Sequence, residues 1–180
     1  MSTLLKLTIS GPPGSGTSTL VAKISESRGW RSMNGGDVFR EEARSRGLSV
    51  EELSSEAKED TDVDRHLDEL LQKHMSSSES PEIVESRLSG WWAHKNDIKC
   101  LRVWLSVSDK ERARRIQKRE GGDFADCLQR SQQRQEDDMD RYSSLYGIDL
   151  DDMSPYHLVI DADNKDEFQV FNEVDAMLER

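Results

Sequence analysis

The chain has 180 residues, and 36 acidic side chains against 25 Lys and Arg leave a formal net charge of -11. A chain of this length predicts one domain, which we place over residues 1–180. A surface of this sign repels phosphate backbones, so the composition argues against a protein that binds a nucleic acid polymer.

Two cysteines, Cys100 and Cys127, are too few and too far apart for a disulfide framework or a paired-cysteine metal site. No segment approaches the roughly 20 apolar residues that cross a bilayer. Residues 1–21 also lack both a basic leader and an apolar stretch. We therefore expect a monomeric, cytoplasmic protein that works without a membrane.

Strand patterns and helix patterns alternate along the whole chain. Apolar residues predict strands at 4–9, 83–84, 101–105 and 157–160, and a further short strand is expected at about 30–33. Helical spacing predicts helices over about 17–29, 37–47, 63–75 and 165–178. Ser49 with Glu52, and Ser108 with Glu111, have the spacing of capping boxes that open two more helices. Parallel neighbours need crossover connections, so this alternation predicts an α/β fold with a five-stranded parallel sheet flanked by helices.

A glycine-rich loop separates the first strand from the first helix. Backbone N–H groups of such a loop can surround an anion, and the helix N-terminus adds partial positive charge. The phosphate-binding motif has Lys where this chain has Thr17, whereas the hydroxyl of Ser18 is placed to ligate Mg2+. The alternative is a Gly/Pro-rich turn that binds no ligand. The residues expected to hold the anion are Gly11, Pro12, Pro13, Gly14, Ser15, Gly16, Thr17, Ser18 and Thr19.

Four further stretches, taken with this loop, resemble the archaeal-type cytidylate kinases. They follow the family's order along the chain, and they are Gly36–Arg40, Glu85–Trp91, Arg112–Glu120 and Arg141–Asp149. The resemblance implies a P-loop nucleoside monophosphate kinase fold. Its core would span about 1–34, 82–110 and 150–180, with a monophosphate-binding insert at about 35–81 and a lid at about 111–149. It also implies transfer of the γ-phosphoryl group of ATP to CMP or dCMP, with ATP and Mg2+ as cofactors.

The missing lysine leaves a charge to be supplied by another residue. Losing one well-placed transition-state donor costs about 100- to 1000-fold in rate unless another group replaces it. Family members with a Gly-Thr-Thr-Thr loop occur, so we interpret Thr17 as a family variant and expect an arginine to supply the charge. Arg112, Arg115 and Arg119 share one helical face. By resemblance they are lid arginines that close over ATP, with Arg115 and Arg119 catalytic; the alternative is a solvated helix paired with carboxylates.

The resemblance also assigns the acceptor site. Arg40, on the first helix of the insert, and Arg87, just past the strand that ends at Glu85, would grip the phosphate of CMP as catalytic residues. For each, the alternative is an ordinary surface arginine. Asp37 is assigned to the same substrate site, and Asp37 and Glu85 are candidates to shape the water shell of Mg2+.

Spacings of four and three residues place Arg134, Asp138 and Arg141 along one polar helical face. A carboxylate and a guanidinium together can distinguish cytosine from uracil. By resemblance, Arg134 and Asp138 read the base while Arg141 contacts phosphate. The alternative is a set of surface ion pairs.

These observations predict an ATP-dependent cytidylate kinase that forms CDP or dCDP and ADP without a covalent intermediate. Two alternatives stay open. One is a kinase for another nucleoside monophosphate, AMP or UMP. The other, suggested by Thr17 and the low apolar content of 34%, is a catalytically weak nucleotide-binding regulatory protein on the same scaffold.

Overall fold

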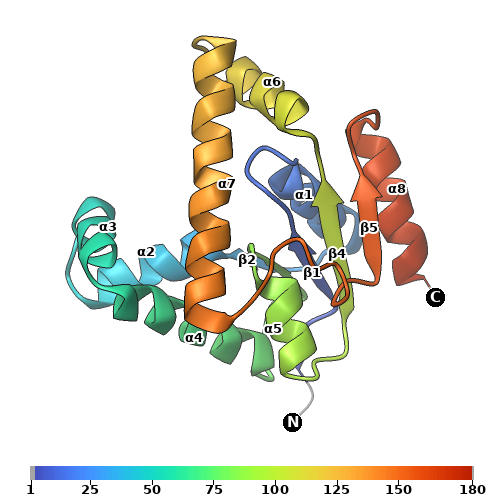
Figure 1. Cartoon of the computed structure of the whole chain (residues 1–180). Coiled ribbons are helices and arrows are strands. Elements are labelled where there is room, and N and C mark those ends of the chain that lie inside the picture. The colour runs from blue at the N-terminus through green and yellow to red at the C-terminus, as the bar shows by residue number, and fades with distance from the viewer. Residues whose placement is uncertain (1–2, 180) are drawn as a thin grey trace.

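Five parallel strands form the centre of the molecule in a computed structural model that describes residues 3–179 (Figure 1). The strands are β1 (Leu7–Ser10), β2 (Ser32–Asn34), β3 (Ile83–Glu85), β4 (Leu101–Ser106) and β5 (Leu158–Asp161), in the order β2-β3-β1-β4-β5. All four residues of β1 are buried, as expected for a central strand with neighbours on both sides. The predicted five-stranded parallel sheet is confirmed.

One face of the sheet is covered by α1 (Thr17–Arg28) and α8 (Glu167–Leu178). Their apolar side chains pack on those of the central strands and form the main core, which includes Leu7, Ile9, Leu20, Ile24, Val103, Leu105, Ile160 and Val174. The two helices are also joined by an ion pair between Arg28 Nη2 and Asp175 Oδ1 at 2.6 Å. This packing fixes the start of α1 at the carboxyl end of β1.

The opposite face is covered by α5 (Ser89–Lys95), α2 (Gly35–Ser45) and α4 (Thr61–Ser76). Helix α5 is absent from the sequence prediction because its seven residues have no capping side chain and include Gly90. It forms through tertiary packing: Gly90 lies against the Tyr156 ring, and Trp92 and Ala93 are buried. Such packing leaves no local signal in the sequence.

Helices α2, α3 (Val50–Glu59) and α4 enclose a small core of their own, built on Ala43, Leu53 and Val63. The predicted capping box between Ser49 and Glu52 is present at the start of α3. Helix α2 begins at Gly35, two residues before the predicted start, because Asn34 and Asp37 form a reciprocal capping box that the sequence prediction missed.

Two antiparallel helices, α6 (Asp109–Glu120) and α7 (Phe124–Tyr146), pack along each other. In Figure 1, α7 stands beside the sheet, with α6 against its upper part and α2–α4 near its lower end. The capping box predicted at the start of α6 is only half formed. Ser108 accepts from the Glu111 N–H, but the Ser108 N–H donates to Asp163 Oδ1 at 2.7 Å, and the Glu111 carboxylate instead pairs with Arg114 and Arg115.

Among the residues that the structure describes, no helix combines the length and the apolar character needed to cross a bilayer.

Candidate active site

The glycine-rich loop turns sharply between β1 and α1. Gly14 and Gly16 adopt φ values of 78° and 89°, in the left-handed region that side chains other than glycine rarely adopt. A Cβ on Gly11 would lie 2.5 Å from Ser15 Oγ and 2.9 Å from the Leu105 carbonyl oxygen. Larger residues at these positions would therefore open the loop or strain it.

The N-terminus of α1 has features that suit the binding of an anion. Within residues 3–179, no side chain caps this helix, whose N-cap is Gly16, and its first turn contains no acidic residue. By contrast, Asp60, Ser108, Asp123 and Asp166 side chains cap α4, α6, α7 and α8. Free N–H groups at a helix N-terminus beside a glycine loop fit the phosphate chain of a nucleoside triphosphate.

Two hydroxyl groups at the start of α1 meet one carboxylate. Thr17 Oγ1 donates to Glu85 Oε1 at 2.7 Å, and Ser18 Oγ lies 3.3 Å from the same oxygen. Hydroxyl and carboxylate oxygens are the ligands that Mg2+ prefers, and Mg2+ usually takes only one or two protein carboxylates beside water and phosphate. The donor set of Ser18 and Glu85 therefore fits this ion.

A cavity of about 420 Å³ lies on one side of the loop, between α1, α6 and α8. Its apolar floor includes Leu20 and Leu105, and its rim carries Lys118 and Lys165. Arg115 stretches across it from α6, with Nη1 3.3 Å from the Ser15 carbonyl oxygen and Nη2 2.8 Å from that of Ala162. The combination of a flat apolar floor and cations suits a nucleotide base with its first phosphates.

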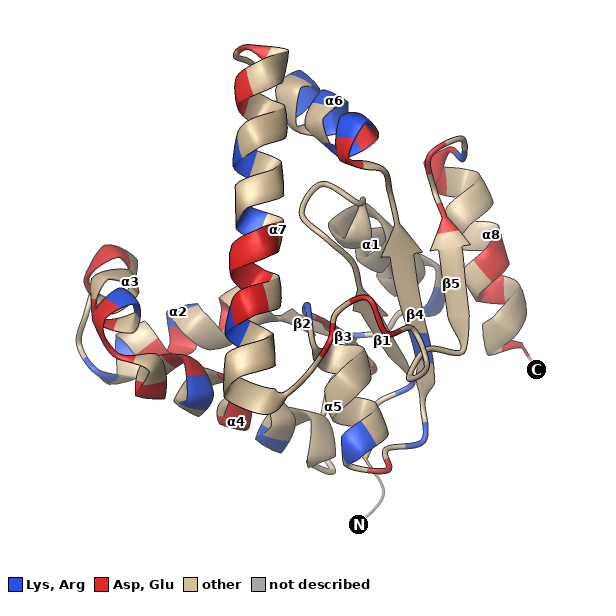
Figure 2. Cartoon of the chain, in the orientation of Figure 1, with Lys and Arg blue, Asp and Glu red and all other residues tan. Residues whose placement is uncertain are grey.

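A second cavity, of about 370 Å³, lies between the loop and the α6–α7 pair. Thr17 lines it, and four arginines from three different segments surround it: Arg87, Arg119, Arg130 and Arg134. Arg119 is 65% exposed and pairs with Glu120 at 2.8 Å. Figure 2 shows the concentration of basic residues on α6 above the loop. The local charge is therefore positive in a chain whose net charge is negative.

Arg87 is the most firmly held of these four arginines. Its Nη1 donates to the Gly11 carbonyl oxygen at 2.6 Å, and its Nε donates to Asp138 Oδ2 at 2.9 Å. Arg87 lines both the cavity at the loop and the next one, between β3, α2 and α7. It therefore stands between two separate hollows.

Asp138 is 7% exposed and orients two arginines. Its second oxygen, Oδ1, accepts from Arg141 Nη2 at 2.8 Å. Both carboxylate oxygens have guanidinium partners, so Asp138 holds Arg87 and Arg141. It also lines the cavity between β3, α2 and α7, and its base-reading role stays a prediction. Arg134 is exposed, lines the cavities on both sides, and makes no ion pair with any described residue.

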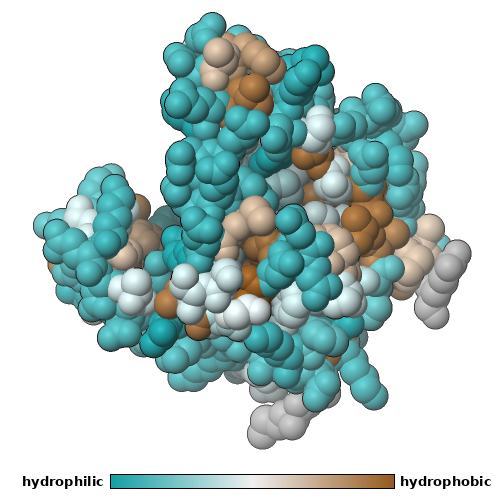
Figure 3. All heavy atoms as spheres, viewed as in Figure 1, coloured by the Kyte–Doolittle hydropathy of each residue, from teal (hydrophilic) through white to brown (hydrophobic). Residues whose placement is uncertain are grey.

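The hollow beyond Arg87 consists of two adjoining cavities of about 430 and 710 Å³. Gly36, Asp68, Arg134, Arg141 and Tyr142 line both of them. In Figure 3 the surface is hollowed on both sides of the α7 column, on this side between α7 and the lobe of α2–α4. A hollow of this size, rimmed by arginines at one end, fits a second small anionic ligand.

Asp64 and Asp68 are site residues that sequence reasoning missed. Asp68 accepts a hydrogen bond from the Tyr146 hydroxyl, and Asp64 lies 3.7 Å from Arg141 Nη1. Burial raises the pKa of Asp68 to about 6 and also raises the pKa of Asp64. A signal was present in the sequence, because Asp64, Leu67, Asp68 and Leu71 share one helical face that mixes acidic with apolar residues.

Asp37 and Arg40 lie at the edge of this hollow. Asp37 accepts from the Asn34 N–H and from Arg40 Nη2, at 2.8 and 2.7 Å, so its carboxylate is committed to the capping box and one ion pair. Asp37 is not among the residues that line the two cavities, and its assignment to the substrate site and to the water shell of Mg2+ stays a prediction. The Arg40 guanidinium lies over Gly36, 55% exposed.

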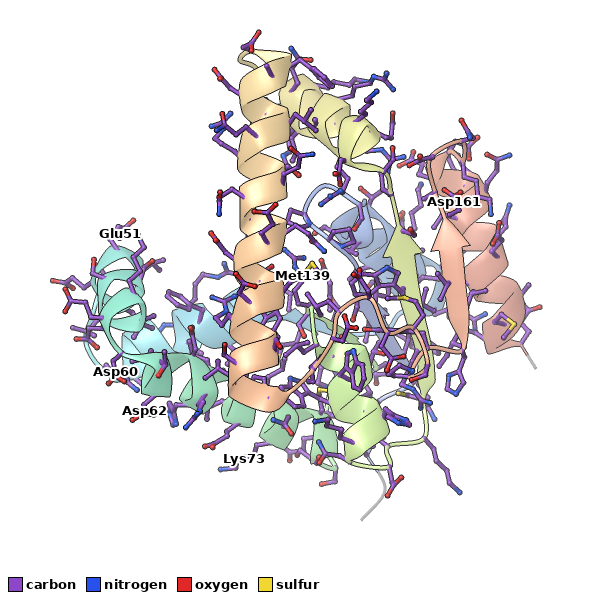
Figure 4. The ribbon with its side chains drawn as sticks, in the orientation of Figure 1. Glu51, Asp60, Asp62, Lys73, Met139 and Asp161 are labelled. Atoms are coloured by element: carbon purple, nitrogen blue, oxygen red, sulfur yellow. The ribbon has the colours of Figure 1, made fainter. Side chains whose placement is uncertain are left out.

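Apart from Asp64 and Asp68, the acidic residues of α2–α4 do not line the hollows. Figure 4 shows Glu51, Asp60 and Asp62 at the outer end of α3 and α4, pointing outward, and all three are exposed. Met139, labelled on α7 in the same view, packs with the α4–α5 core. These three exposed carboxylates are therefore not among the groups around the arginines at the loop.

The strand, glycine loop, uncapped helix and surrounding arginines define a P-loop nucleoside triphosphate-binding protein. The fold agrees with solved structures: a gluconokinase from Sinorhizobium meliloti has a TM-score of 0.61 and 17% identity, covering 100% of this chain and 94% of that one. A shikimate kinase from Bacteroides thetaiotaomicron has a TM-score of 0.61 and 15% identity, with 97% and 96% coverage. The family model described as AAA domain matches residues 7–144.

Relatives with higher sequence identity to this chain are named cytidylate kinase. A cytidylate kinase from Archaeoglobus fulgidus is 41% identical over 162 residues, covering 90% of this chain and 88% of the relative. One from Methanothrix thermoacetophila is 42% identical, with 89% and 90% coverage, and one from Methanopyrus kandleri is 34% identical, with 97% and 95% coverage. The chain belongs to the cytidylate kinase family of P-loop proteins, which confirms the resemblance seen in the sequence.

Proposed function

We propose that this chain transfers the γ-phosphoryl group of ATP to CMP or dCMP and forms CDP or dCDP and ADP. The observation that carries the proposal is the line of three hollows along the loop. A cavity suited to a nucleotide, an arginine-lined cavity at the loop and a hollow for a second anionic ligand follow one another, and Arg87 lines the last two. A reaction between two anionic nucleotides needs one site for each nucleotide and positive charge between the two sites.

ATP would bind with its base over the apolar floor beside Arg115 and with its phosphates on the amides of residues 14–19. Ser18 and Glu85 are the residues that would hold Mg2+, which neutralises charge on the β and γ oxygens when bound. Arg119 would bring a further positive charge to the phosphates from α6, in the segment that we propose as the lid.

CMP would occupy the hollow between α2–α4 and α7, the segment that we propose as the monophosphate-binding insert. Its phosphate would lie near Arg87, Arg141 and Arg40. Asp68 and Asp64, with Arg134, supply the acceptors and donors for the base. The amino group of cytosine donates, whereas the corresponding oxygen of uracil only accepts, so a carboxylate at this point favours cytosine.

The chain acts by positioning and electrostatics. The acceptor phosphate and the ATP phosphates repel each other, and arginines between them lower that repulsion and allow an in-line approach. Arg87 and Arg134 line both cavities, so their guanidinium groups can neutralise charge that develops as the phosphoryl group moves. No side chain becomes covalently modified.

Turnover by the purified chain tests the proposal. CMP, dCMP, UMP and AMP are each supplied with the same MgATP concentration, and ADP release is followed together with the diphosphate product. We expect the cytosine nucleotides to give the highest kcat/KM. Faster turnover of AMP or UMP would contradict the cytosine assignment, and ATP binding without turnover of any monophosphate would support the regulatory alternative.

A further inference from the structure

We propose that Arg87 supplies, at the phosphate-binding loop, the positive charge that a lysine at position 17 supplies in the usual motif. The inference rests on the proposed use of ATP. Position 17 itself provides no cation, because threonine is neutral. Its hydroxyl donates to Glu85 at 2.7 Å. The replacement must therefore come from another segment that reaches the loop.

Contacts separate the candidates. Arg119 pairs with Glu120, and Arg130 contacts the Asp126 carbonyl oxygen and the Cys127 sulfur. Neither of them donates to the loop. Among the residues that the structure describes, two arginines do so: Arg87 to the Gly11 carbonyl and Arg115 to the Ser15 carbonyl.

Arg87 and Arg115 lie on different sides of the loop. Arg115 lines the cavity of Leu20 and Lys165, and its Nε is paired with Glu111 at 3.1 Å. Arg87 lines the cavity that contains Thr17, Pro13 and Gly14. Of the two arginines that donate to the loop, Arg87 is therefore the one on the Thr17 side, where a lysine would project.

The geometry of Arg87 leaves donors available. A guanidinium has five N–H groups. One on Nε is used by Asp138 and one on Nη1 by Gly11. The other three are available to the adjoining cavities, and the side chain is 20% exposed there. Asp138 and the loop carbonyl fix the orientation of Arg87 before any ligand binds, so Asp138 is a positioning residue for this cation.

Binding of MgATP in the absence of CMP tests the inference. Calorimetry would compare the unmodified chain with Arg87→Gln, Thr17→Lys and the double variant. We expect Arg87→Gln to weaken ATP binding by on the order of 10- to 100-fold, the range for a lost hydrogen bond to a charged group. Lysine at position 17 should restore most of that loss in the double variant, because it returns a cation to the same side of the loop.

Arg115→Gln and its double variant with Thr17→Lys form the matched control. Arg115→Gln should also weaken ATP binding, but lysine at position 17 should not restore it, because Arg115 acts in the other cavity. Two results would overturn the inference. In one, Arg87→Gln leaves ATP affinity unchanged and raises only the KM for CMP, as expected of a group that serves the acceptor alone. In the other, lysine rescues Arg115→Gln and not Arg87→Gln.

Two further measurements keep the test interpretable. Thermal unfolding of each variant establishes that the chain is folded, and if Arg87→Gln does not fold, Arg87→Lys replaces it. Arg87→Lys keeps the charge but loses the fork, so its smaller loss of ATP affinity should again be restored by Thr17→Lys, and absence of that rescue would contradict the inference. Since no acceptor is present, failure of the chain to phosphorylate CMP would contradict the proposed function without changing this result.

Discussion

Several side chains of the site form hydrogen bonds with partners that are distant in sequence. Asp138 meets Arg87 across 51 positions, and Asp68 meets Tyr146 across 78. The glycine loop and Ser18 have a local signal in the sequence, whereas Arg87 is singled out only through the family resemblance. The partners of Asp138 and the role of Asp68 could not, because they arise only when α4, α7 and the segment after β3 are brought together.

Protonation of Asp68 stabilises the folded chain, so its contribution to the free energy of unfolding falls as the pH rises. Burial raises its pKa from 3.8 to about 6, so between these values the folded chain holds a proton that the unfolded chain releases. The stabilising contribution of this group is complete below about pH 4 and is lost as the pH rises through about 6. We therefore predict that the free energy of unfolding falls less between pH 4 and 6 in Asp68→Asn than in the unmodified chain.

Urea unfolding of both proteins across this pH range is the measurement. The comparison of the two curves removes the contribution of the other carboxylates. Parallel curves would show that Asp68 titrates in the folded chain as it does in the unfolded one.

At the scale of elements, helix α5 depends on one close approach. A Cβ on Gly90 would lie 2.3 Å from Tyr156 Cε1, inside a packed region that also contains Trp104. Gly90→Ala should therefore destabilise the fold by about 1–3 kcal/mol, the usual cost of overpacking. Gly35→Ala is the matched control, since its Cβ would lie 3.8 Å from the nearest atom and should cost little. Equal unfolding free energies for the two variants would contradict this account of α5.

The α2–α4 segment holds a core that the rest of the molecule does not share. Leu53 is fully buried and packs only in that cluster. Leu53→Ala should remove about 2–5 kcal/mol of packing, and the loss should appear first within α2–α4. Amide exchange is expected to quicken in residues 35–76 while the sheet remains protected. Leu20→Ala, in the main core, should instead quicken exchange in the sheet; a uniform effect in both variants would argue that the segment is not a separate cooperative unit.

The elements could be predicted to different degrees for physical reasons. The four strands other than β2 have apolar runs bounded by turn residues, and the long helices have apolar stripes, so these elements have local signals. Strand β2 contains only one apolar residue, Met33. The cap of α6 differs from prediction because the nearest polar side chain in space differs from the nearest in sequence: Asp163 takes the Ser108 N–H that Glu111 was expected to take. The start of α2 differs because the prediction missed the local capping box between Asn34 and Asp37.

At the scale of the whole molecule, charge is separated. Most of the acidic side chains behind the net charge of -11 do not line the cavities at the loop, whereas arginines from α6, α7 and the segment after β3 gather around it. Composition alone therefore described the exterior and could not reveal the basic interior of the site. The family resemblance supplied the expected residues of the loop, the lid and the acceptor site, and the structure shows that Arg87 and Arg134 line two of the hollows.

The most direct measurement is a crystal structure of the chain with cytidine and adenosine joined by a chain of phosphates. We predict adenosine in the cavity of Arg115, the phosphates on the amides of residues 14–19 with Arg87 beside them, and cytidine near Asp68 and Tyr142. Phosphates bound away from the loop, or a cytidine that leaves the hollow between α4 and α7 empty, would contradict the account.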